Sequence, residues 1–454
     1  MSSKTPGKTK AKPKAKPKPK SRKTVNRSDV RHDAAVSGAG RQLSLTSQAL
    51  GRVLTFEYPA DAVLSRFFQE HRELGHRERG FIAETIYAVV RRLRWLYRLA
   101  GPEATSWQLL LTWLARGEGW PMRQFEGLVS ATETEWIGEI KARTLAEGTL
   151  AERADLPDWL AGRLLESYDE GVFLELAYSL NRPAPLDLRV NVLKAERDEV
   201  LARLIRDGIE AVPAALSPQG IRLQGKPALQ KHPLFVDGSF EVQDEGSQIL
   251  GFLLQPRRGE MVVDFCAGAG GKTLQLGALM RSTGRLYAFD VAEKRLARLR
   301  PRVARAGLSN VHPVWIDHEH DARLKRFAGK ADRVLVDAPC SGLGTLRRNP
   351  DLKWRQAPDA IAEMAARQRD ILDAAAKLVR PGGRLVYATC SLLKRENDDV
   401  VDAFLATHPE FTPLAAEQVL SAQGIALATG ERLRLSPLAH DTDGFFAAVF
   451  ERRG

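Results

Sequence analysis

Apolar side chains recur at helical spacing through residues 41–170. Steps of four, three, four and three residues place one run of them on a single face of a helix. This run consists of Ile82, Ile86, Val89, Leu93 and Leu96. The spacing predicts an all-α domain over residues 41–170.

The pattern changes twice in the remainder of the chain. The stretch from Leu186 to Asn191 alternates as a strand does, residues 196–207 have helical spacing, and short strands punctuated by Pro and Gly follow. This order predicts a small α+β module over residues 171–245. Over residues 246–454, apolar strand-like runs are separated by helical stretches, which indicates βαβ units and a mostly parallel, Rossmann-like sheet.

The positive charge of the chain is concentrated at its N-terminus. The net charge of the 454 residues is +12, yet residues 1–27 alone contain nine Lys and two Arg and no acid. They alternate Lys with Pro, Ala, Ser and Thr, so we expect a disordered basic arm over residues 1–40 that either attracts nucleic-acid phosphates or keeps the protein soluble. The rest is nearly neutral, with −6 over residues 28–250 and +7 over residues 251–454.

Several classes of protein are excluded by what the sequence lacks. No apolar run approaches the roughly 18 residues that a membrane helix needs, and no apolar signal-peptide segment follows the basic start. We therefore expect a soluble, cytoplasmic protein. Its three cysteines, Cys266, Cys340 and Cys390, cannot all pair and form no CxxC motif, so we expect neither a disulfide framework nor a metal site.

A glycine-rich turn separates the strand-like run Met261 to Phe265 from a helical run. A turn of this kind brings backbone N–H groups close to a ligand. A P-loop would need glycine at Cys266, and a dinucleotide fingerprint starting at Gly268 would need Gly or Ala at Thr273. Because both patterns fail, we expect a nucleoside-type cofactor. The expected contacts are Cys266, Ala267, Gly268, Ala269, Gly270, Gly271 and Lys272.

Three later strand-like runs each end in an aspartate. Asp290 lies where a carboxylate can accept both ribose hydroxyl protons, and Asp317 suits an adenine amino group. The third, Asp337, precedes Ala-Pro-Cys. A single terminal aspartate is more often a helix cap or turn residue. The ordered set is typical of enzymes that use S-adenosylmethionine.

Two cysteines follow the predicted ends of strands. Cys340 stands in Asp-Ala-Pro-Cys-Ser-Gly, and Cys390 in Ala-Thr-Cys-Ser. Because the carboxyl ends of the strands of an open α/β sheet form its ligand crevice, both thiols are candidates for chemistry. Cys266 is better explained as a small buried side chain beside the cofactor loop.

The motifs together resemble the Sun/NOL1/NOP2 family of RNA cytosine-5 methyltransferases. The resemblance covers residues 170–454, and the preceding part is similar to the NusB-like helical domain of bacterial ribosomal RNA members. Ala269 departs from the family, which often has proline there. The matching segments are 189–191, 243–248, 266–273, 337–344, 348–351, 388–391 and 442–446.

The resemblance implies S-adenosylmethionine as cofactor and 5-methylcytosine as product. Cytosine carbon 5 is a poor nucleophile, so a thiolate first adds to carbon 6, and by resemblance this thiolate is Cys390. Cys340 would assist loss of the carbon 5 proton, and Lys272 would supply positive charge or position the base. Asp337, protonated or sharing a proton with nitrogen 3, would stabilise the developing negative charge of the ring. DNA enzymes use the Pro-Cys cysteine as nucleophile, but the Thr-Cys-Ser context favours the RNA arrangement.

The target cytosine must be single-stranded or flipped out of a helix. We expect RNA contacts at Arg347, Arg348 and Lys353 beside Cys340, and at Arg189 in the α+β module, which is RRM-like by resemblance. The NusB-like domain favours 16S ribosomal RNA and a monomeric enzyme. Two alternatives stay open: a methyltransferase that acts on transfer RNA, and a non-catalytic RNA-binding or ribosome assembly factor on the same fold.

Overall fold

The N-terminal lobe of the protein is helical. The computed structural model describes residues 38–454, and the predicted arm over 1–40 lies outside it except for residues 38–40, which begin the first helix. The lobe agrees with the predicted all-α region, although its last helix continues to Leu180. Its helices are α1 (Gly38–Val53), α2 (Ala60–Glu70), α3 (His76–Arg91), α4 (Leu93–Ala100), α5 (Ser106–Thr112), α6 (Ala131–Ala142), α7 (Leu150–Arg153), α8 (Asp158–Leu165) and α9 (Glu170–Leu180).

The predicted apolar stripe forms the centre of this lobe. Its five side chains are buried, but they lie on two helices, because α3 and α4 are separated at Arg92. Asp155 causes the second helix to start there: its carboxylate accepts hydrogen bonds from the N–H groups of Arg94 (2.9 Å) and Trp95 (3.2 Å) and pairs with Arg92 (3.0 Å). A buried carboxylate thus satisfies two N–H groups that have no partner within the helix.

The predicted α+β module is a four-stranded antiparallel sheet with two helices. Its strand and helix predictions at Leu186–Asn191 and 196–207 are confirmed by β1 and α10. The sheet order β2-β3-β1-β4 and the βαββαβ succession are those of a ferredoxin-like fold. The elements are β1 (Leu186–Val190), α10 (Arg197–Arg206), β2 (Ala211–Pro213), β3 (Gly220–Leu223), α11 (Pro233–Val236) and β4 (Phe240–Val242).

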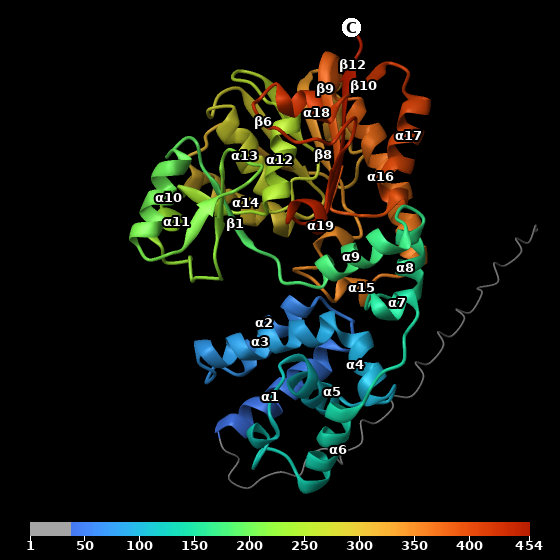
Figure 1. Ribbon diagram of the computed structural model, residues 1–454. Coiled ribbons are helices and arrows are strands. Elements are labelled where there is room, and N and C mark those ends of the chain that lie inside the picture. Colours follow the sequence, from blue (N-terminus) through green and yellow to red (C-terminus); the bar gives the residue numbers. More distant parts are fainter. Residues whose placement is uncertain (1–37) are drawn as a thin grey trace, which may run out of the picture.

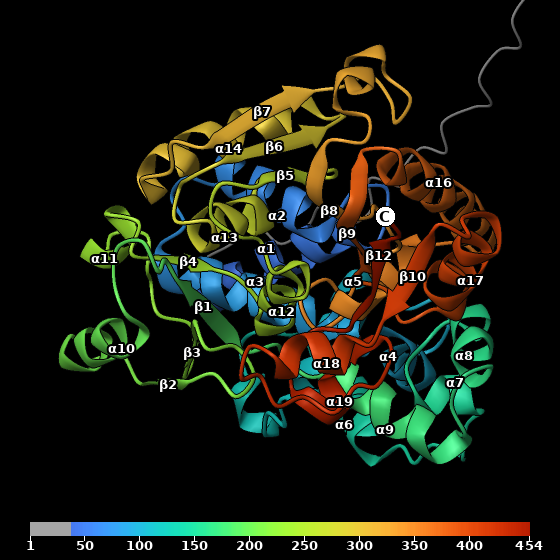
Figure 2. The same ribbon diagram turned by 90° about the horizontal axis from the view of Figure 1, so that it is seen from above.

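The C-terminal domain contains the predicted Rossmann-like sheet. Its strands run in the order β10-β12-β9-β8-β5-β6-β7, with β11 paired to β12 (Figure 2). Strands β5 to β9 are parallel and β12 is antiparallel to β9. The strands are β5 (Met261–Asp264), β6 (Arg285–Asp290), β7 (Val311–Trp315), β8 (Ala331–Asp337), β9 (Val379–Thr389), β10 (Phe411–Leu414), β11 (Leu433–Leu435) and β12 (Phe445–Arg452).

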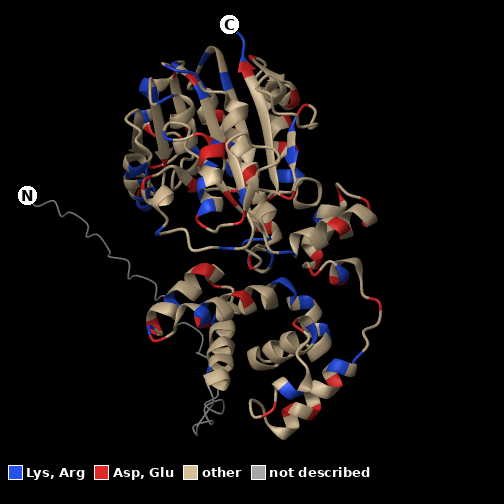
Figure 3. Ribbon diagram, turned by 60° about the vertical axis from the view of Figure 1, so that its left-hand side comes forward, with Lys and Arg blue, Asp and Glu red and all other residues tan. Residues whose placement is uncertain are grey.

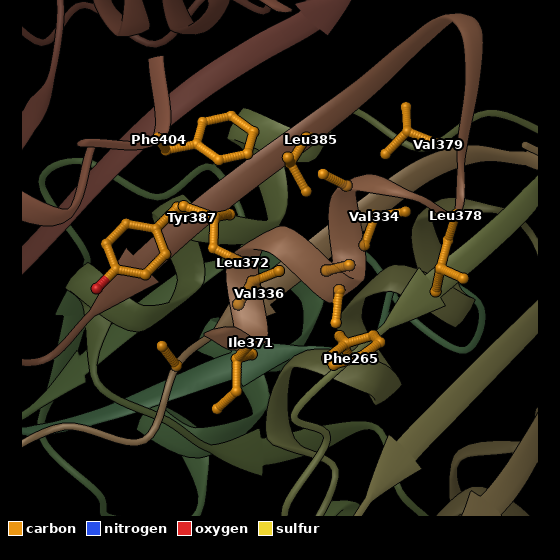
Figure 4. Close-up of a cluster of buried hydrophobic side chains, with 14 of the residues drawn as sticks. Phe265, Val334, Val336, Ile371, Leu372, Leu378, Val379, Leu385, Tyr387 and Phe404 are labelled. Carbon is orange, nitrogen blue, oxygen red and sulfur yellow. The ribbon is translucent and has the colours of Figure 1, made fainter. Parts of the chain in front are cut away.

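Helices cover both faces of this sheet. Ile371 and Leu372 of α16 and Phe404 of α17 pack on Val336 and Tyr387 at one face (Figure 4). Full burial of an apolar side chain such as Ile371, Leu372 or Phe404 stabilises the fold by about 1.5–3 kcal/mol. The opposite face is covered mainly by α12, α13 and α18. The helices of the domain are α12 (Glu245–Leu254), α13 (Gly271–Leu279), α14 (Glu293–Ala306), α15 (Leu352–Arg355), α16 (Pro358–Ala376), α17 (Asp398–Thr407), α18 (Ala416–Ser421) and α19 (Pro437–His440).

One strand of this domain ends earlier than predicted. The strand-like run that was expected to end in Asp317 is β7, which ends two residues earlier, at Trp315. Within β9 the register against β8 shifts, and Gly382 there has a φ of 69°. In the part of the chain that the structure describes, no helix is long and apolar enough to span a membrane.

The short helix α15 joins the two lobes (Figure 1). The Lys353 ammonium donates to the backbone oxygens of Arg91 and Asp155, both at 2.7 Å, and to Asn181 Oδ1 at 3.0 Å. The neighbouring Trp354 indole donates to the Val90 oxygen at 2.9 Å. The loop that follows Cys340 therefore ends inside the helical lobe.

Candidate active site

A cavity of about 570 Å³ opens at the carboxyl ends of β5, β6, β8 and β9. Its volume is in the range of cavities that hold small ligands. The glycine loop forms one wall, and the two strand-end cysteines, Cys340 and Cys390, form another. The topology thus brings together most of the predicted cofactor and catalytic residues.

The glycine loop has the backbone that a closely approaching ligand requires. Gly268 and Gly270 have φ values of 56° and 89°, in the left-handed region. A Cβ atom at Gly270 would also collide with Leu299. Helix α13 begins at the next residue, Gly271, so its free N–H groups lie at the loop.

Asp264, at the end of β5, is a buried acid of the cavity wall. One carboxylate oxygen accepts the Thr273 hydroxyl at 2.7 Å, while Oδ1 has no hydrogen-bond partner among the described residues. Burial raises the pKa of Asp264 to about 7. An unpaired buried acceptor at a cavity is a place where a ligand donor fits.

Asp264 was not predicted as a cofactor contact, and two of the three acids that were predicted, Asp290 and Asp317, differ in placement. Asp290 lines the cavity, and its carboxylate accepts the N–H groups of Gly268 (2.7 Å) and Ala292 (2.6 Å), which fixes the glycine loop. The structure does not bring Asp317 to the cavity wall: its side chain is 54% exposed and pairs with Arg323 at 2.7 Å. Asp317 lies away from the cavity because β7 ends two residues before it, at Trp315.

Lys272 and Asp337 form an ion pair beside the thiols, with Nζ 2.7 Å from Oδ2. Burial disfavours the charged lysine, but Asp337, with a smaller effect of Cys390, outweighs it and raises the pKa of Lys272. The ammonium group is therefore charged at neutral pH. Lys272 thus places a positive charge at the cavity wall that also carries Cys390.

The sulfur atoms of Cys340 and Cys390 lie 3.2 Å apart. The hydrogen bond with Cys390, and then burial, raise the pKa of the Cys340 thiol well above its ordinary value. Either thiol can be the donor of this contact, and the Cys340 sulfur also accepts the backbone N–H of Cys390 at 3.3 Å. Burial also raises the pKa of Cys266, which lines the cavity and packs on the core as the sequence predicts.

The structure corrects the expected RNA contacts, because all four side chains are used inside the protein. Arg189 is 3% exposed and donates to the Gly271 oxygen at 2.7 Å and to Gln243. Arg348 bridges Asp244 (2.8 Å) and Asp443 (2.6 Å). Arg347 is 4% exposed: its side chain pairs with Asp441 at 2.8 Å, and its backbone oxygen accepts the Arg91 guanidinium at 2.8 Å. Lys353 is 1% exposed and holds the lobe junction, as described for α15. Figure 3 shows basic and acidic residues interspersed over both lobes.

Sequence reasoning missed two exposed arginines at the cavity, Arg295 of α14 and Arg367 of α16. Each lies within an amphipathic helix whose other arginines point elsewhere, so spacing alone did not single them out. Gln243 also lines the cavity, and a signal for it was present in the matching segment 243–248.

The sheet order, the glycine loop and the acids at strand ends define a Rossmann-like domain for a nucleoside cofactor. A family model described as "16S rRNA methyltransferase RsmB/F" matches residues 251–451. A second model, for the ferredoxin-like domain of RsmF/B-like methyltransferases, matches residues 156–230. This second range includes α8 and α9 and ends before β4.

Individual relatives agree. A probable ribosomal RNA small subunit methyltransferase B of Synechocystis is 37% identical over 305 residues, 67% of this chain and 68% of the relative. The protein of the same description from Bacillus subtilis is 33% identical over 72% of this chain and 73% of its own. The crystal structure of PH0851 has a TM-score of 0.77 and 28% identity, covering 92% of this chain and all of the other.

The chain belongs to the RsmB/F family of 16S rRNA methyltransferases. It is therefore an RNA methyltransferase that depends on S-adenosylmethionine. The cavity fits this cofactor, because it combines the glycine loop with the unpaired acceptor of Asp264 and the carboxylate of Asp290. The resemblance stated from the motifs is confirmed, and the NusB-like character of the helical lobe stays a prediction.

Proposed function

We propose that the protein methylates carbon 5 of a cytosine in 16S ribosomal RNA through a covalent adduct with Cys390. The observation that carries the proposal is the pair of sulfurs 3.2 Å apart, next to the Lys272–Asp337 ion pair and at the cofactor cavity. A methyltransferase acting on a more nucleophilic atom would not need two thiols at this place.

The glycine loop, Asp290 and Asp337 would hold the cofactor, which supplies an electrophilic methyl group when bound. The Cys390 thiolate adds to carbon 6 of the cytosine, and the electron pair of the 5,6 double bond moves toward carbon 5 and nitrogen 3. Lys272 stabilises that negative charge from the ring edge, and Asp337 does so by sharing a proton with nitrogen 3. Carbon 5 then takes the methyl group.

The adduct resolves by elimination. The proton on carbon 5 leaves to a base, the carbon 5–carbon 6 double bond re-forms, and the Cys390 sulfur departs with its electron pair. Cys340 is the nearest thiol to this sulfur and assists the release, directly or through water. Its raised pKa suits a group that gives and takes a proton rather than a permanent thiolate.

The target RNA would be selected outside the cavity. We assign this to the helical lobe, as a NusB-like domain, together with the ferredoxin-like module, and we propose a monomer. The exposed Arg295 and Arg367 replace the four predicted arginine and lysine contacts as candidates for phosphate binding at the cavity mouth.

Substitution of each cysteine tests this assignment. Cys390→Ala should abolish both methylation and adduct formation, because Cys390 is the group assigned to add to carbon 6. Cys340→Ala should accumulate a covalent RNA adduct on denaturing gels, since release is blocked. Cys266→Ala is the comparison for the third thiol: at saturating S-adenosylmethionine it should neither abolish methylation nor accumulate an adduct. Adducts in Cys390→Ala and none in Cys340→Ala would reverse the roles.

Bisulfite mapping of RNA from a deletion strain tests the substrate. The expected result is loss of one 5-methylcytosine from 16S ribosomal RNA and its return on complementation. Loss from transfer RNA alone would identify the other substrate class. An unchanged map would support a non-catalytic role in ribosome assembly.

A further inference from the structure

A buried carboxylate that the mechanism does not use lies beneath the two cysteines. Glu396 is 0% exposed and ends the 3-10 turn Lys394–Glu396, just ahead of α17. It is in the same cavity-forming region as the thiols but does not line the cavity. It therefore cannot touch the base or the cofactor as the structure stands.

This carboxylate contacts the residue that follows each cysteine. It accepts the N–H of Ser341 at 2.8 Å and its hydroxyl at 2.5 Å. It accepts the Ser391 hydroxyl, also at 2.5 Å. Gln368 of α16 completes the set with an amide donor at 3.0 Å. Four donors on one buried carboxylate make a strong anchor, because hydrogen bonds to a charged group are stronger than neutral ones.

Neighbouring contacts fix the carboxylate itself. The Tyr387 hydroxyl donates to the Glu396 backbone oxygen at 2.6 Å. Asn397 accepts the Thr389 hydroxyl at 2.6 Å and donates to the Ser391 oxygen at 3.0 Å. The anchor is thus attached to the core side of β9, whereas the cysteine loops project from strand ends.

We propose that Glu396 is a positioning residue that holds the Cys340 and Cys390 loops at the spacing required for attack and release. The inference rests on the proposed function for the roles of the two thiols, but the spacing itself is a property of the protein alone. Without the carboxylate, the two loops lose their shared anchor. The contact between the two serine hydroxyls at 3.2 Å and the hydrogen bond from the Gly344 N–H to the Cys390 oxygen at 2.9 Å remain, so the spacing of the thiols is held less tightly.

Glu396→Gln is the principal test, because it keeps the size of the side chain and replaces one acceptor oxygen with a donor. Ser341→Ala and Ser391→Ala are milder variants that each detach one loop. Asp399→Asn is the matched control: this carboxylate is three residues away, half exposed, and pairs with Lys394. Each full-length variant is first checked for S-adenosylmethionine affinity and melting temperature.

The first measurement concerns the spacing and needs no RNA. Diamide takes the hydrogens of two thiols, forms the disulfide and is itself reduced to the hydrazine. The Cys340–Cys390 linkage is followed by peptide mapping, which distinguishes it from products of Cys266. We expect Glu396→Gln to slow its formation at least about tenfold, and each serine variant to slow it less. An unchanged rate in all three would overturn the proposal.

The second measurement concerns turnover. A positioning role predicts a lower kcat with an unchanged KM for S-adenosylmethionine in Glu396→Gln, whereas general loosening of the domain would raise that KM as well. A raised KM with an unchanged kcat would also overturn the proposal. If wild-type enzyme methylates no RNA but the linkage still slows in the variants, the proposed function fails and the positioning role stands.

Discussion

A single residue, Asp264, brings a buried oxygen that lacks a hydrogen-bond partner to the cofactor cavity. Its carboxylate is buried, holds Thr273 with one oxygen and leaves the other without a partner among the described residues. Such a group is costly in the free protein. Ligand binding can recover part of that cost by offering a donor.

The affinity for S-adenosylmethionine should therefore depend on pH through Asp264. A ligand donor favours the carboxylate, and below a pKa of about 7 the free protein carries a proton there that binding must displace. We expect the affinity to fall as pH decreases below about 7, by at most about tenfold for each pH unit. Calorimetric titrations between pH 5.5 and 8.5, chosen to span that value, measure it.

Asp264→Asn supplies the comparison for these titrations. The amide does not titrate, so its affinity should be weaker at high pH and nearly flat across the range. Equal slopes for the variant and the parent enzyme would place the titrating group elsewhere.

For single residues, the sequence predicted which side chains lie at the cavity better than it predicted what the charged side chains contact. Cys340, Cys390 and Lys272 were found because each lies in a short local motif, and the topology places strand ends together. The role of Lys353 could not be found, because its acceptors are up to 262 positions away in the chain. Burial of a charged side chain depends on such distant partners, and local spacing carries no information about them.

At the scale of elements, strand β1 of the ferredoxin-like module reaches the cofactor loop. Arg189 leaves β1 and donates to the Gly271 oxygen at 2.7 Å, while Arg302 of α14 donates to the Ala269 oxygen at 2.6 Å. Arg302 and Arg305 also pair with Glu241 of β4. The module is thus attached to the loop from outside the cavity, through the backbone.

Arg189→Lys should consequently weaken cofactor binding more than RNA binding. A lysine cannot reach both Gly271 and Gln243 in the geometry of a guanidinium group, so we expect the Kd for S-adenosylmethionine to rise about tenfold. RNA affinity at fixed salt should change by less than about twofold. Arg206→Lys, an exposed position on α10, is the control. A larger loss of RNA affinity than of cofactor affinity would restore Arg189 as an RNA contact.

The order of the elements was predicted more reliably than their ends. Alternation identified β1, continuous apolar runs identified β5, β6 and β8, and helical spacing identified α10 and α13. The end of β7 was misplaced because Ile316, one residue beyond it, is also buried, which extends the apolar run past the last strand pair. Pairing with the neighbouring strand, rather than hydrophobicity, decides where a strand stops.

At the scale of the whole molecule, most of the net charge and the family match lie in different parts of the chain. Residues 1–27 contribute +11 of the net +12, whereas the family match begins at residue 156. The described lobes mix acidic and basic residues (Figure 3). Non-specific attraction and target choice can therefore be separated by experiment.

Removal of residues 1–27 should weaken RNA affinity and reduce its dependence on salt, because fewer counterions are released on binding. Site choice and the rate of methylation at saturating RNA should stay unchanged. Affinity measured from 50 to 300 mM salt, a range chosen to resolve the slope, together with bisulfite mapping of the product, gives both answers. Methylation at new positions would show that the arm takes part in target choice.

The contact made by Lys353 also bears on how such proteins can be recombined. A chimaera that takes its helical lobe from a relative would receive new acceptors around this ammonium group, which is buried and needs all three of its present ones. No single crossover point between the lobes would preserve these hydrogen bonds, because the lysine belongs to the catalytic domain and its acceptors to the helical lobe. The helical lobe and residues 351–355 would have to be exchanged together, as one unit.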